Sequence, residues 1–559
     1  DKLEWSRRQK VASIFAGSQL QLRKNRHIDF DGRIFAGFSV MEGKDFHFIY
    51  DKNWMVLDSV RYFDLFIPDP ESGGDEMYSI ASRLEHFSGI LMIDAPSNKS
   101  GRLDIDMFPS LHTRSPAYVY YDRDTTLGFD RDSFYFEVAP FHFNNLDQLT
   151  PEAIAFEGRL RSANIMPDLE ETLQLRADAS LGFETTLEDA GQPLFGGKGI
   201  FKGKVELGNQ GMKGVGSLSY LGATVESEDI VFKREQLTAS ADQFSLEEDR
   251  ESEIQVPQVF GEKVRIDWQP YKDSMYVSAA GKPFDLFRAG EHTLAGKLIL
   301  TPDGLKGNGS LDWSMARMNS ELLSFKANSV SADTSNFMIK AIDSDEMALQ
   351  TDNVSGTVDF DQQIAGFRAN ANQLTTLLPY NRYQTTMNEF DWEMQNQKVL
   401  FRALEGQPGS FLSTDPVRES LNFEGQTAYY DLQSSELKIG GVPYIITADA
   451  FIFPDSGRVD IAPGGKMSTL LNARIVADTL NQNHTINRAT VNIDGRKHYS
   501  ASGFYEYNIG DRAQEIEFGE IIGTRVGPGK IQFRKVETRA RGEIKEEDNL
   551  YIDHKTRFK

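Results

Sequence analysis

The chain has 559 residues, a formal charge of −23 and a hydrophobic content of 40%. This length and composition fit folded domains, and the acidic charge argues against nucleic acid and anionic membrane surfaces as partners. The absence of cysteine excludes disulfides, thiolate metal sites and cysteine nucleophiles. No apolar run reaches the length of about 18 to 20 residues that a membrane-spanning helix needs.

The N-terminal region is predicted to form strands. Residues 1–26 are mixed and basic, and residues 11–22 could form a strand pair or a frayed helix, with strands favoured. Further on, apolar residues alternate with polar ones at the period of a half-buried strand, which predicts strands over 28–34, 46–50 and 56–65. His47 lies between Phe46 and Phe48, so it points to the opposite face and is interpreted as a surface residue.

A loop and a short helix are predicted next. Residues 67–76 combine proline, glycine and acidic residues, which is typical of a solvated loop. Its carboxylates could hold Ca²⁺, but the spacing of a calcium loop is missing. Tyr78, Ala81 and Leu84 follow at helical spacing, so a short helix is predicted over 77–87.

An acidic hairpin follows, between predicted strands at 118–121 and 133–138. Its carboxylates are Asp122, Asp124, Asp130 and Asp132. Paired acids could serve a glycosidase, and clustered acids could bind Ca²⁺. Because the chain has 83 acidic residues, such clusters arise by chance, and a solvated hairpin is the favoured interpretation.

A linker is predicted at 144–154, and a second short helix at 166–173. In this second helix Pro167 would stand near the first helical position, with acidic residues in the first turn.

The centre of the chain holds a duplicated segment. Residues 203–244 recur at a constant offset of 93 residues, without a gap over 42 positions. The matched pairs include Gly203 with Gly296, Gly216 with Gly309, Ser227 with Ser320, Glu228 with Glu321, and Phe244 with Phe337. Apolar residues alternate with polar or small ones around these glycines, which predicts strands, with the glycines at tight turns between strands and at bulges. Such a repeat predicts units that stack on their neighbours.

A shorter echo has an offset of 124 residues. Residues 266–268 and 275–279 resemble residues 390–392 and 399–403, and each set is predicted to form a strand, a polar turn and a strand. A loop is predicted over 407–419, because prolines and glycine interrupt the pattern there. Strands resume over 421–462.

The predicted fold is therefore all-β: an elongated array of antiparallel or solenoid-like β repeats with few short helices. Three regions are predicted, with boundaries in the loops near 67–76, 144–154 and 405–420. They are an N-terminal β region (1–150), central β repeats (151–405, with the duplicated unit at about 191–246 and 281–339) and a C-terminal β region (406–559).

Several segments resemble large, uncharacterised cell-envelope β-repeat proteins of Bacteroidota. The resemblance is carried by residues 203–220, 227–232, 440–445 and 448–454 and covers most of the chain. It implies a location in the cell envelope, either the periplasm or the outer membrane and cell surface. The family offers no catalytic motif, so no catalytic, cofactor-binding or metal-ligating residue is assigned. The strand–glycine–strand pattern is also loosely similar to AsmA/TamB and LptA-type proteins, whose β groove carries lipid.

Three functions are weighed. The first is a non-enzymatic envelope scaffold or lipid-conducting β groove, with lipid or outer-membrane proteins as partners, within a longer chain or complex. The second is a surface adhesin or glycan-binding module that uses exposed aromatic residues such as Tyr120, Tyr121, Tyr429 or Tyr430, although packing on a strand face is favoured for these. The third is a carboxylate-dependent glycosidase. Nine scattered histidines form no zinc or triad motif, so we expect no enzymatic activity and no cofactor.

Overall fold

The computed structural model describes residues 2–68, 77–288, 290–371, 375–403, 407–509, 512–525 and 536–542. Within these residues the chain forms 44 strands, and its helices are eight 3-10 turns of three residues each. The strands pair antiparallel, which confirms the predicted all-β fold. The predicted loop at 67–76 lies almost entirely outside the described residues.

The chain divides into two compact units. The first comprises residues 1–246, 261–282 and 300–302, and the second comprises residues 247–260, 283–299 and 303–559. The sequence predicts three regions with boundaries near 150 and 405. The division into two units does not test these boundaries, so they stay a prediction.

In the first unit a meander of long strands leads to a fork. Strands β1 to β5 and β7 pair in chain order. At β7 the pairing divides: one end pairs with β8, which pairs with β11, and Glu85 near the other end pairs with Tyr118 of β9. From β9 the ladder continues through β10, β12, β13, β14, β16, β17, β18 and β19.

The strands up to β21 have these bounds: β1 Lys2–Ser6, β2 Val11–Leu22, β3 Ile28–Ala36, β4 Ser39–Ile49, β5 Trp54–Pro68, β6 Met77–Ser79, β7 Leu84–Met92, β8 Ser110–Thr113, β9 Ala117–Tyr120, β10 Phe134–Val138, β11 His142–Phe143, β12 Ala155–Ser162, β13 Leu169–Leu175, β14 Leu181–Thr186, β15 Gln192–Leu194, β16 Gly199–Gly208, β17 Gly211–Tyr220, β18 Ala223–Phe232, β19 Leu237–Leu246, β20 Val259–Gln269 and β21 Ser274–Ala279. The 3-10 turns among them are η1 Lys24–Arg26, η2 Thr125–Leu127, η3 Pro151–Ala153 and η4 Pro270–Lys272.

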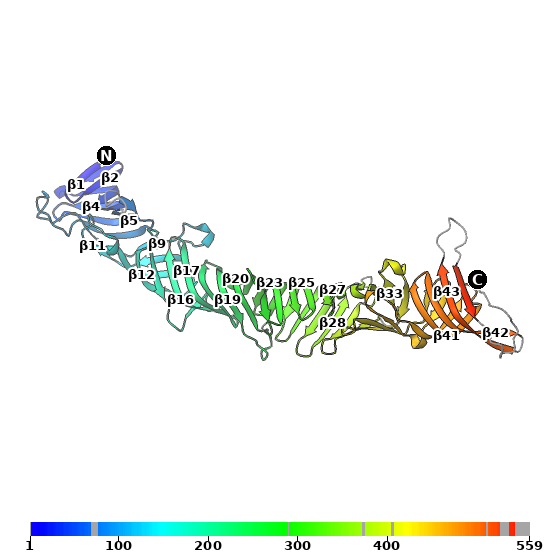
Figure 1. Cartoon of the computed structure of the whole chain (residues 1–559). Helices are drawn as coiled ribbons and strands as arrows, with labels where there is room; N and C mark the ends of the chain where they lie inside the picture. The colour runs from blue at the N-terminus through cyan, green and yellow to red at the C-terminus, as the bar shows by residue number, and fades with distance from the viewer. Residues whose placement is uncertain are drawn as a thin grey trace. The chain divides into compact units, whose positions relative to one another are not determined.

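The second unit repeats this plan. Strands β24 to β27 pair in chain order and stand side by side in the green part of Figure 1. At β27 the ladder divides. One branch runs through β28, β31, β32, β35, β36 and β39. The other runs through β29, β30, β33, β34, β37, β38 and β40 to β44. The chain therefore alternates between two ladders, one hairpin at a time.

The later strands have these bounds: β22 Phe284–Leu286, β23 His292–Thr301, β24 Gly304–Trp313, β25 Ala316–Phe325, β26 Ser329–Lys340, β27 Met347–Asp359, β28 Ile364–Ala369, β29 Thr376–Leu378, β30 Tyr383–Thr385, β31 Glu389–Glu393, β32 Lys398–Arg402, β33 Gly409–Ser413, β34 Asn422–Gly425, β35 Thr427–Asp431, β36 Glu436–Gly440, β37 Ile445–Thr447, β38 Ala450–Phe453, β39 Val459–Ile461, β40 Leu470–Ala477, β41 His484–Gly495, β42 His498–Ile509, β43 Arg512–Arg525 and β44 Val536–Gly542. The 3-10 turns are η5 Pro379–Asn381, η6 Pro416–Arg418, η7 Asp455–Gly457 and η8 Pro463–Gly465.

The duplicated segment folds into two matching sets of strands, β16–β19 and β23–β26. In the first set Gly203 and Gly216 pair directly across β16 and β17, at φ values of +137° and +148°. A Cβ on Gly203 would lie 2.2 Å from the Val215 carbonyl oxygen, and one on Gly216 would lie 2.1 Å from the Lys202 carbonyl oxygen. Only glycine fits such a conformation and such a close approach, so the repeated glycines mark a point where the strands bend.

The bend folds each long strand so that its two halves face each other across a core. Leu218 of β17 pairs with Phe201, and Met212 at the other end of β17 pairs with Phe232. The Phe201 and Phe232 rings nevertheless contact each other, with centroids 5.4 Å apart. Phe201, Leu218, Phe232 and the neighbouring Phe244 have no exposed surface, so side chains fill the space between the two halves.

The repeated glycines are predicted to lie at bulges and at tight turns between strands. The structure confirms the bulge, and the turns are wrong. The register shifts between Gly214 and Gly216, as a bulge requires. However, Gly203, Gly214 and Gly216 lie within strands, and the turn between β16 and β17 is at 209–210.

The short helix predicted at 77–87 is wrong, because this segment contains β6 and the start of β7. The buried residues are Ile80, Ser82, Leu84 and Phe87, and the first three alternate as in an extended chain. Ser82 hides that pattern because it is polar, and its hydroxyl oxygen accepts a hydrogen bond from the Leu181 N–H at 2.9 Å.

The helix predicted at 166–173 is also wrong, because β13 begins at Leu169. The acidic residues do not interact with a helix terminus. Glu170 pairs with Arg159 at 2.5 Å across β12 and β13, and Asp168 pairs with Arg161. Cross-strand ion pairs of this kind produce the same acid-rich sequence as a helix start.

The remaining element predictions have mixed outcomes. Residues 11–22 are extended, as the favoured prediction has it, but they form one strand, β2, and not a strand pair. The echo with the 124-residue offset is confirmed: β20 pairs with β21, and β31 pairs with β32. The predicted loop at 407–419 is wrong in part, because it contains β33 and η6.

Candidate functional site: a cleft at the mouth of the folded sheet

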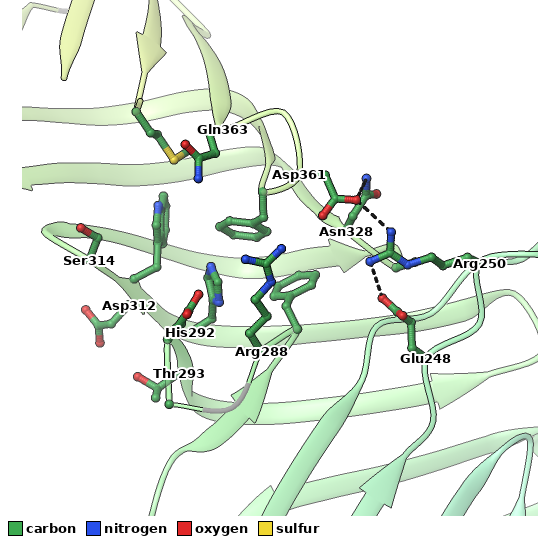
Figure 2. A pocket seen from close by; sticks show the side chains of 17 residues that line it. Glu248, Arg250, Arg288, His292, Thr293, Asp312, Ser314, Asn328, Asp361 and Gln363 are labelled. Carbon is green, nitrogen blue, oxygen red and sulfur yellow. Dashed lines mark hydrogen bonds and ion pairs between the residues drawn. The ribbon is translucent and has the colours of Figure 1, made fainter. Parts of the chain in front are cut away.

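In the second unit a cleft of about 660 Å³ lies where the ends of the folded strands meet (Figure 2). We define it by its lining residues: Glu248, Arg250, Phe287, Arg288, Gly290, Glu291, His292, Thr293, Asp312, Trp313, Ser314, Ala327, Asn328, Phe360, Asp361, Gln363 and Met394. Ser314 follows β24, and Asn328 follows β25, so the two ends of β25 border the same cleft. A straight strand of that length would separate its ends by roughly 30 Å. The cleft therefore lies at the mouth of the folded sheet, opposite the bend.

Aromatic rings form the floor of the cleft. The His292 and Phe360 ring centroids are 4.3 Å apart, Phe287 and Phe360 are 4.6 Å apart, and Trp313 and Phe360 are 5.7 Å apart. Phe287 also lies 6.3 Å from Phe325 at the far end of β25. These ring contacts join both ends of the folded strand and hold the mouth at a fixed width.

One wall of the cleft is an ion-pair cluster. The Arg250 guanidinium pairs with Glu248 and with Asp361, each at 2.9 Å. Asn328 donates a hydrogen bond from Nδ2 to Asp361 at 3.3 Å. The hydrogen bond from Arg250 holds the pKa of Asp361 below its ordinary value, and the two carboxylates raise the pKa of Arg250. The dashed lines in Figure 2 mark these contacts.

Two ring nitrogens at the cleft lack partners. His292 is 7% exposed and Trp313 is 4% exposed. Within the described part of the chain, neither His292 Nδ1 nor Trp313 Nε1 has a hydrogen-bond partner. Burial lowers the pKa of His292, which keeps the imidazole neutral.

Arg288 is the cation of the cleft that has no carboxylate partner among the described residues. Figure 2 shows its guanidinium directed toward the space beside His292, with Gln363 across from it. Arg288 is exposed. The cleft thus offers a guanidinium and side-chain amides as donors, and carboxylates as acceptors, above an apolar floor.

The acidic hairpin does not form a site of its own. Asp122 pairs with Arg131 at 2.7 Å, and Asp124 caps η2 by accepting a hydrogen bond from the Thr126 N–H at 2.9 Å. Asp130 accepts hydrogen bonds from Ser133 and pairs with Arg234. No partner of the Asp132 carboxylate is found in the described structure. In the part of the chain that the structure describes, no group of three or more histidines and acids is placed to hold a metal ion.

The tyrosines predicted as glycan contacts divide into two pairs. Tyr121 and Tyr430 are buried, and the Tyr121 hydroxyl donates a hydrogen bond to the Leu181 carbonyl oxygen at 2.9 Å. Tyr120 and Tyr429 are partly exposed, but basic side chains cover their rings: Arg131 lies 4.5 Å from the Tyr120 centroid, and Lys398 lies 5.6 Å from that of Tyr429. All four therefore pack on strands. His47 is exposed and pairs with Asp29.

Sequence reasoning missed the cleft. The 93-residue offset aligns His292 with Gly199 and Trp313 with Tyr220. The sequence therefore shows a glycine in one copy and a histidine in the other. Only the structure shows that both residues lie where the ends of the folded strands meet, and that the histidine borders a cleft.

No protein-family model matches the chain, and no curated protein matches it at a significant level of similarity. Within the described residues, no helix is long and apolar enough to cross a membrane.

Proposed function

We propose that this chain is a non-enzymatic structural scaffold of the cell envelope, in the periplasm or at the outer membrane. The observation that supports this proposal is the filled interior of the folded sheet. Phe201, Leu218, Phe232 and Phe244 of the first copy have no exposed surface, and neither do Leu311, Met318 and Phe337 of the second. A core packed by its own side chains stabilises a rigid body.

A filled core favours a scaffold over a lipid-conducting groove. Conduction would need an apolar channel that an acyl chain can enter, as the loose likeness to AsmA/TamB and LptA-type proteins suggested. The clefts on the described surface are instead lined by many polar residues. Lipid and outer-membrane proteins remain the partners to test.

Mass spectrometry of lipid extracted from the purified chain tests this proposal. The scaffold predicts much less than one lipid per chain after mild purification from envelope membranes, matched to a preparation of an unrelated soluble β protein. Stoichiometric phospholipid or glycolipid would support the groove. Fractionation of the producing cells should place the chain with the envelope, and recovery with the cytosol would contradict the proposed location.

A second function, glycan binding at the cell surface, is supported by the cleft at the mouth of the second copy. Its aromatic floor and its mixed donors and acceptors are the elements of a saccharide site. A scaffold and a glycan-binding module are compatible in one chain, so each is tested separately.

A further inference from the structure

We infer that the cleft binds a neutral saccharide, with one sugar ring against Phe360 and with its hydroxyl groups on the surrounding amide, guanidinium and carboxylate groups. This inference rests on the second proposed function, and it is independent of the scaffold proposal.

The size of the ligand follows from a comparison with the first copy of the repeat. There a side chain of the protein itself closes the mouth: Trp268 lies 5.2 Å from Tyr220 and 5.3 Å from Phe195 between ring centroids, and it is fully buried. In the second copy Phe360 packs against Trp313 with ring centroids 5.7 Å apart, and His292 lies beside Phe360, so these two rings fill the position of the indole. The cleft of about 660 Å³ that lies open beside them sets the size of the ligand.

The polarity of the ligand follows from the groups around the floor. Arg288, Asn328 and Gln363 supply N–H donors, and the carboxylates of Asp361 and Glu291 supply acceptors. A sugar hydroxyl both donates and accepts, so a polyol satisfies such a mixed set. The partly exposed Phe360 supplies the apolar surface on which the C–H face of a sugar ring packs.

The charge of the ligand follows from the balance of the lining. The lining holds four carboxylates (Glu248, Glu291, Asp312 and Asp361) and two guanidinium groups (Arg250 and Arg288), and Arg317 outside the lining pairs with Asp312 at 2.5 Å, which leaves a formal charge of −1 within a chain of charge −23. An acidic sugar would meet net repulsion in this field. The assignment is therefore a neutral saccharide.

The test uses the full chain and a glycan array that contains neutral, acidic and amino sugars, followed by saturation-transfer NMR with the neutral oligosaccharides that bind. We expect neutral saccharides to bind, and acidic sugars of the same linkage to bind at least about tenfold more weakly.

Two variants locate the binding. Phe360→Ala removes the apolar surface and should weaken binding about tenfold. Asn328→Trp places an indole over the cleft and should abolish binding. The matched control is Tyr271→Ala, which removes an exposed ring outside the cleft and should leave the affinity within about twofold of wild type. Circular dichroism and thermal unfolding confirm that each variant is folded.

Absence of binding by every saccharide on the array at millimolar concentration would overturn the inference and would leave the scaffold proposal untouched. A preference for acidic sugars would overturn the assignment of a neutral ligand. Binding that survives both Phe360→Ala and Asn328→Trp would show that the cleft is not the site.

Discussion

The two copies of the duplicated segment close their mouths in different ways. In the first copy Trp268 packs against Tyr220 at one end of the folded strands, and its neighbour Asp267 accepts a hydrogen bond from Gln236 at the other end, at 2.6 Å. In the second copy Phe360 packs against Trp313 instead, His292 stands at the position of Gly199, and a cleft lies open beside them. The same folded-strand frame therefore carries either a sealed core or a polar cleft, and the difference lies in a few side chains at the mouth.

Gly199 shows why a side chain at this position and an indole at position 268 exclude each other. A Cβ at Gly199 would lie 2.6 Å from the Trp268 ring, so a side chain there and the indole cannot share the space. The second copy places an imidazole at the matching position. The copies have thus diverged at this pair of positions at the mouth, while the bend glycines are identical in both copies.

Removal of the indole should break the sealed mouth. Trp268 is fully buried, so Trp268→Ala should lower the free energy of unfolding by about 3 to 5 kcal/mol. At the open mouth Phe360 is only partly buried, and Phe360→Ala should cost about 1 kcal/mol. Urea unfolding measures both values. Equal costs at the two mouths would contradict the comparison.

A substitution at the bend of the strands should lower the free energy of unfolding about as much as the loss of the Trp268 indole. Gly203→Val forces a β-branched residue into a positive φ and against the Val215 carbonyl oxygen, so it should cost about 3 kcal/mol or more. Gly281→Ala is the control, because its Cβ meets nothing within 4 Å; it should change stability by less than about 1 kcal/mol. A tolerated Gly203→Val would mean that the strand does not bend there.

A double-mutant cycle should sharpen the link between Gly199 and Trp268. Gly199→Ala alone should cost about 1 to 3 kcal/mol, because the methyl group meets the indole. In the Trp268→Ala background the same change should cost less than about 1 kcal/mol, because the methyl group then meets only the Ser219 carbonyl oxygen, at 3.0 Å; this gives a coupling of about 1 to 2 kcal/mol. Additive costs would show that the two residues do not compete for space.

A pH dependence should distinguish the second copy from the first. Burial lowers the folded-state pKa of His292 below 6.5, Glu291 opposes this shift and Arg288 adds to it. The unfolded chain then binds more protons, so the stability that neutral His292 supports is complete above about pH 6.5 and is lost as the pH falls.

His292→Phe should therefore flatten the loss of stability between pH 7.5 and 5.5, measured by urea unfolding. The wild-type residue at the matching position of the first copy, Gly199, has no ionisable side chain. The effect is expected to be the smallest of this series, since His112, whose pKa burial also lowers, contributes in the same direction in both proteins. Identical slopes for wild type and His292→Phe would contradict the assigned shift.

The all-β fold can be predicted from the sequence because the alternation of apolar and polar residues is a local pattern and the duplicated segment is a periodic one. The prediction fails where a bulge or a buried polar residue disturbs the alternation. In β7 both Leu84 and Phe87 point inward, because His86 between them has a φ of +61° and shifts the phase. The predicted helix rests on Tyr78, Ala81 and Leu84, of which only Leu84 is buried. The buried Ile80 and Ser82 show the strand period that this spacing conceals.

The cleft could not be predicted from the sequence because its parts are distant along the chain. Arg250 and Asp361 are separated by 111 positions yet share a hydrogen bond. Neither stands in a motif, and each is an ordinary charged residue within its own turn. Their proximity depends on the bend of the strands between them, which no local pattern of charge reveals.

A distance measurement across the mouth tests the folded sheet most directly. The chain has no cysteine, so spin labels on Ser314→Cys and Asn328→Cys report only the two ends of β25. A straight path of 14 residues would separate them by about 46 Å. The folded strand predicts a narrow distribution centred well below that, at less than about 25 Å. A distribution centred near the straight-strand distance would contradict the fold, the sealed core and the cleft together.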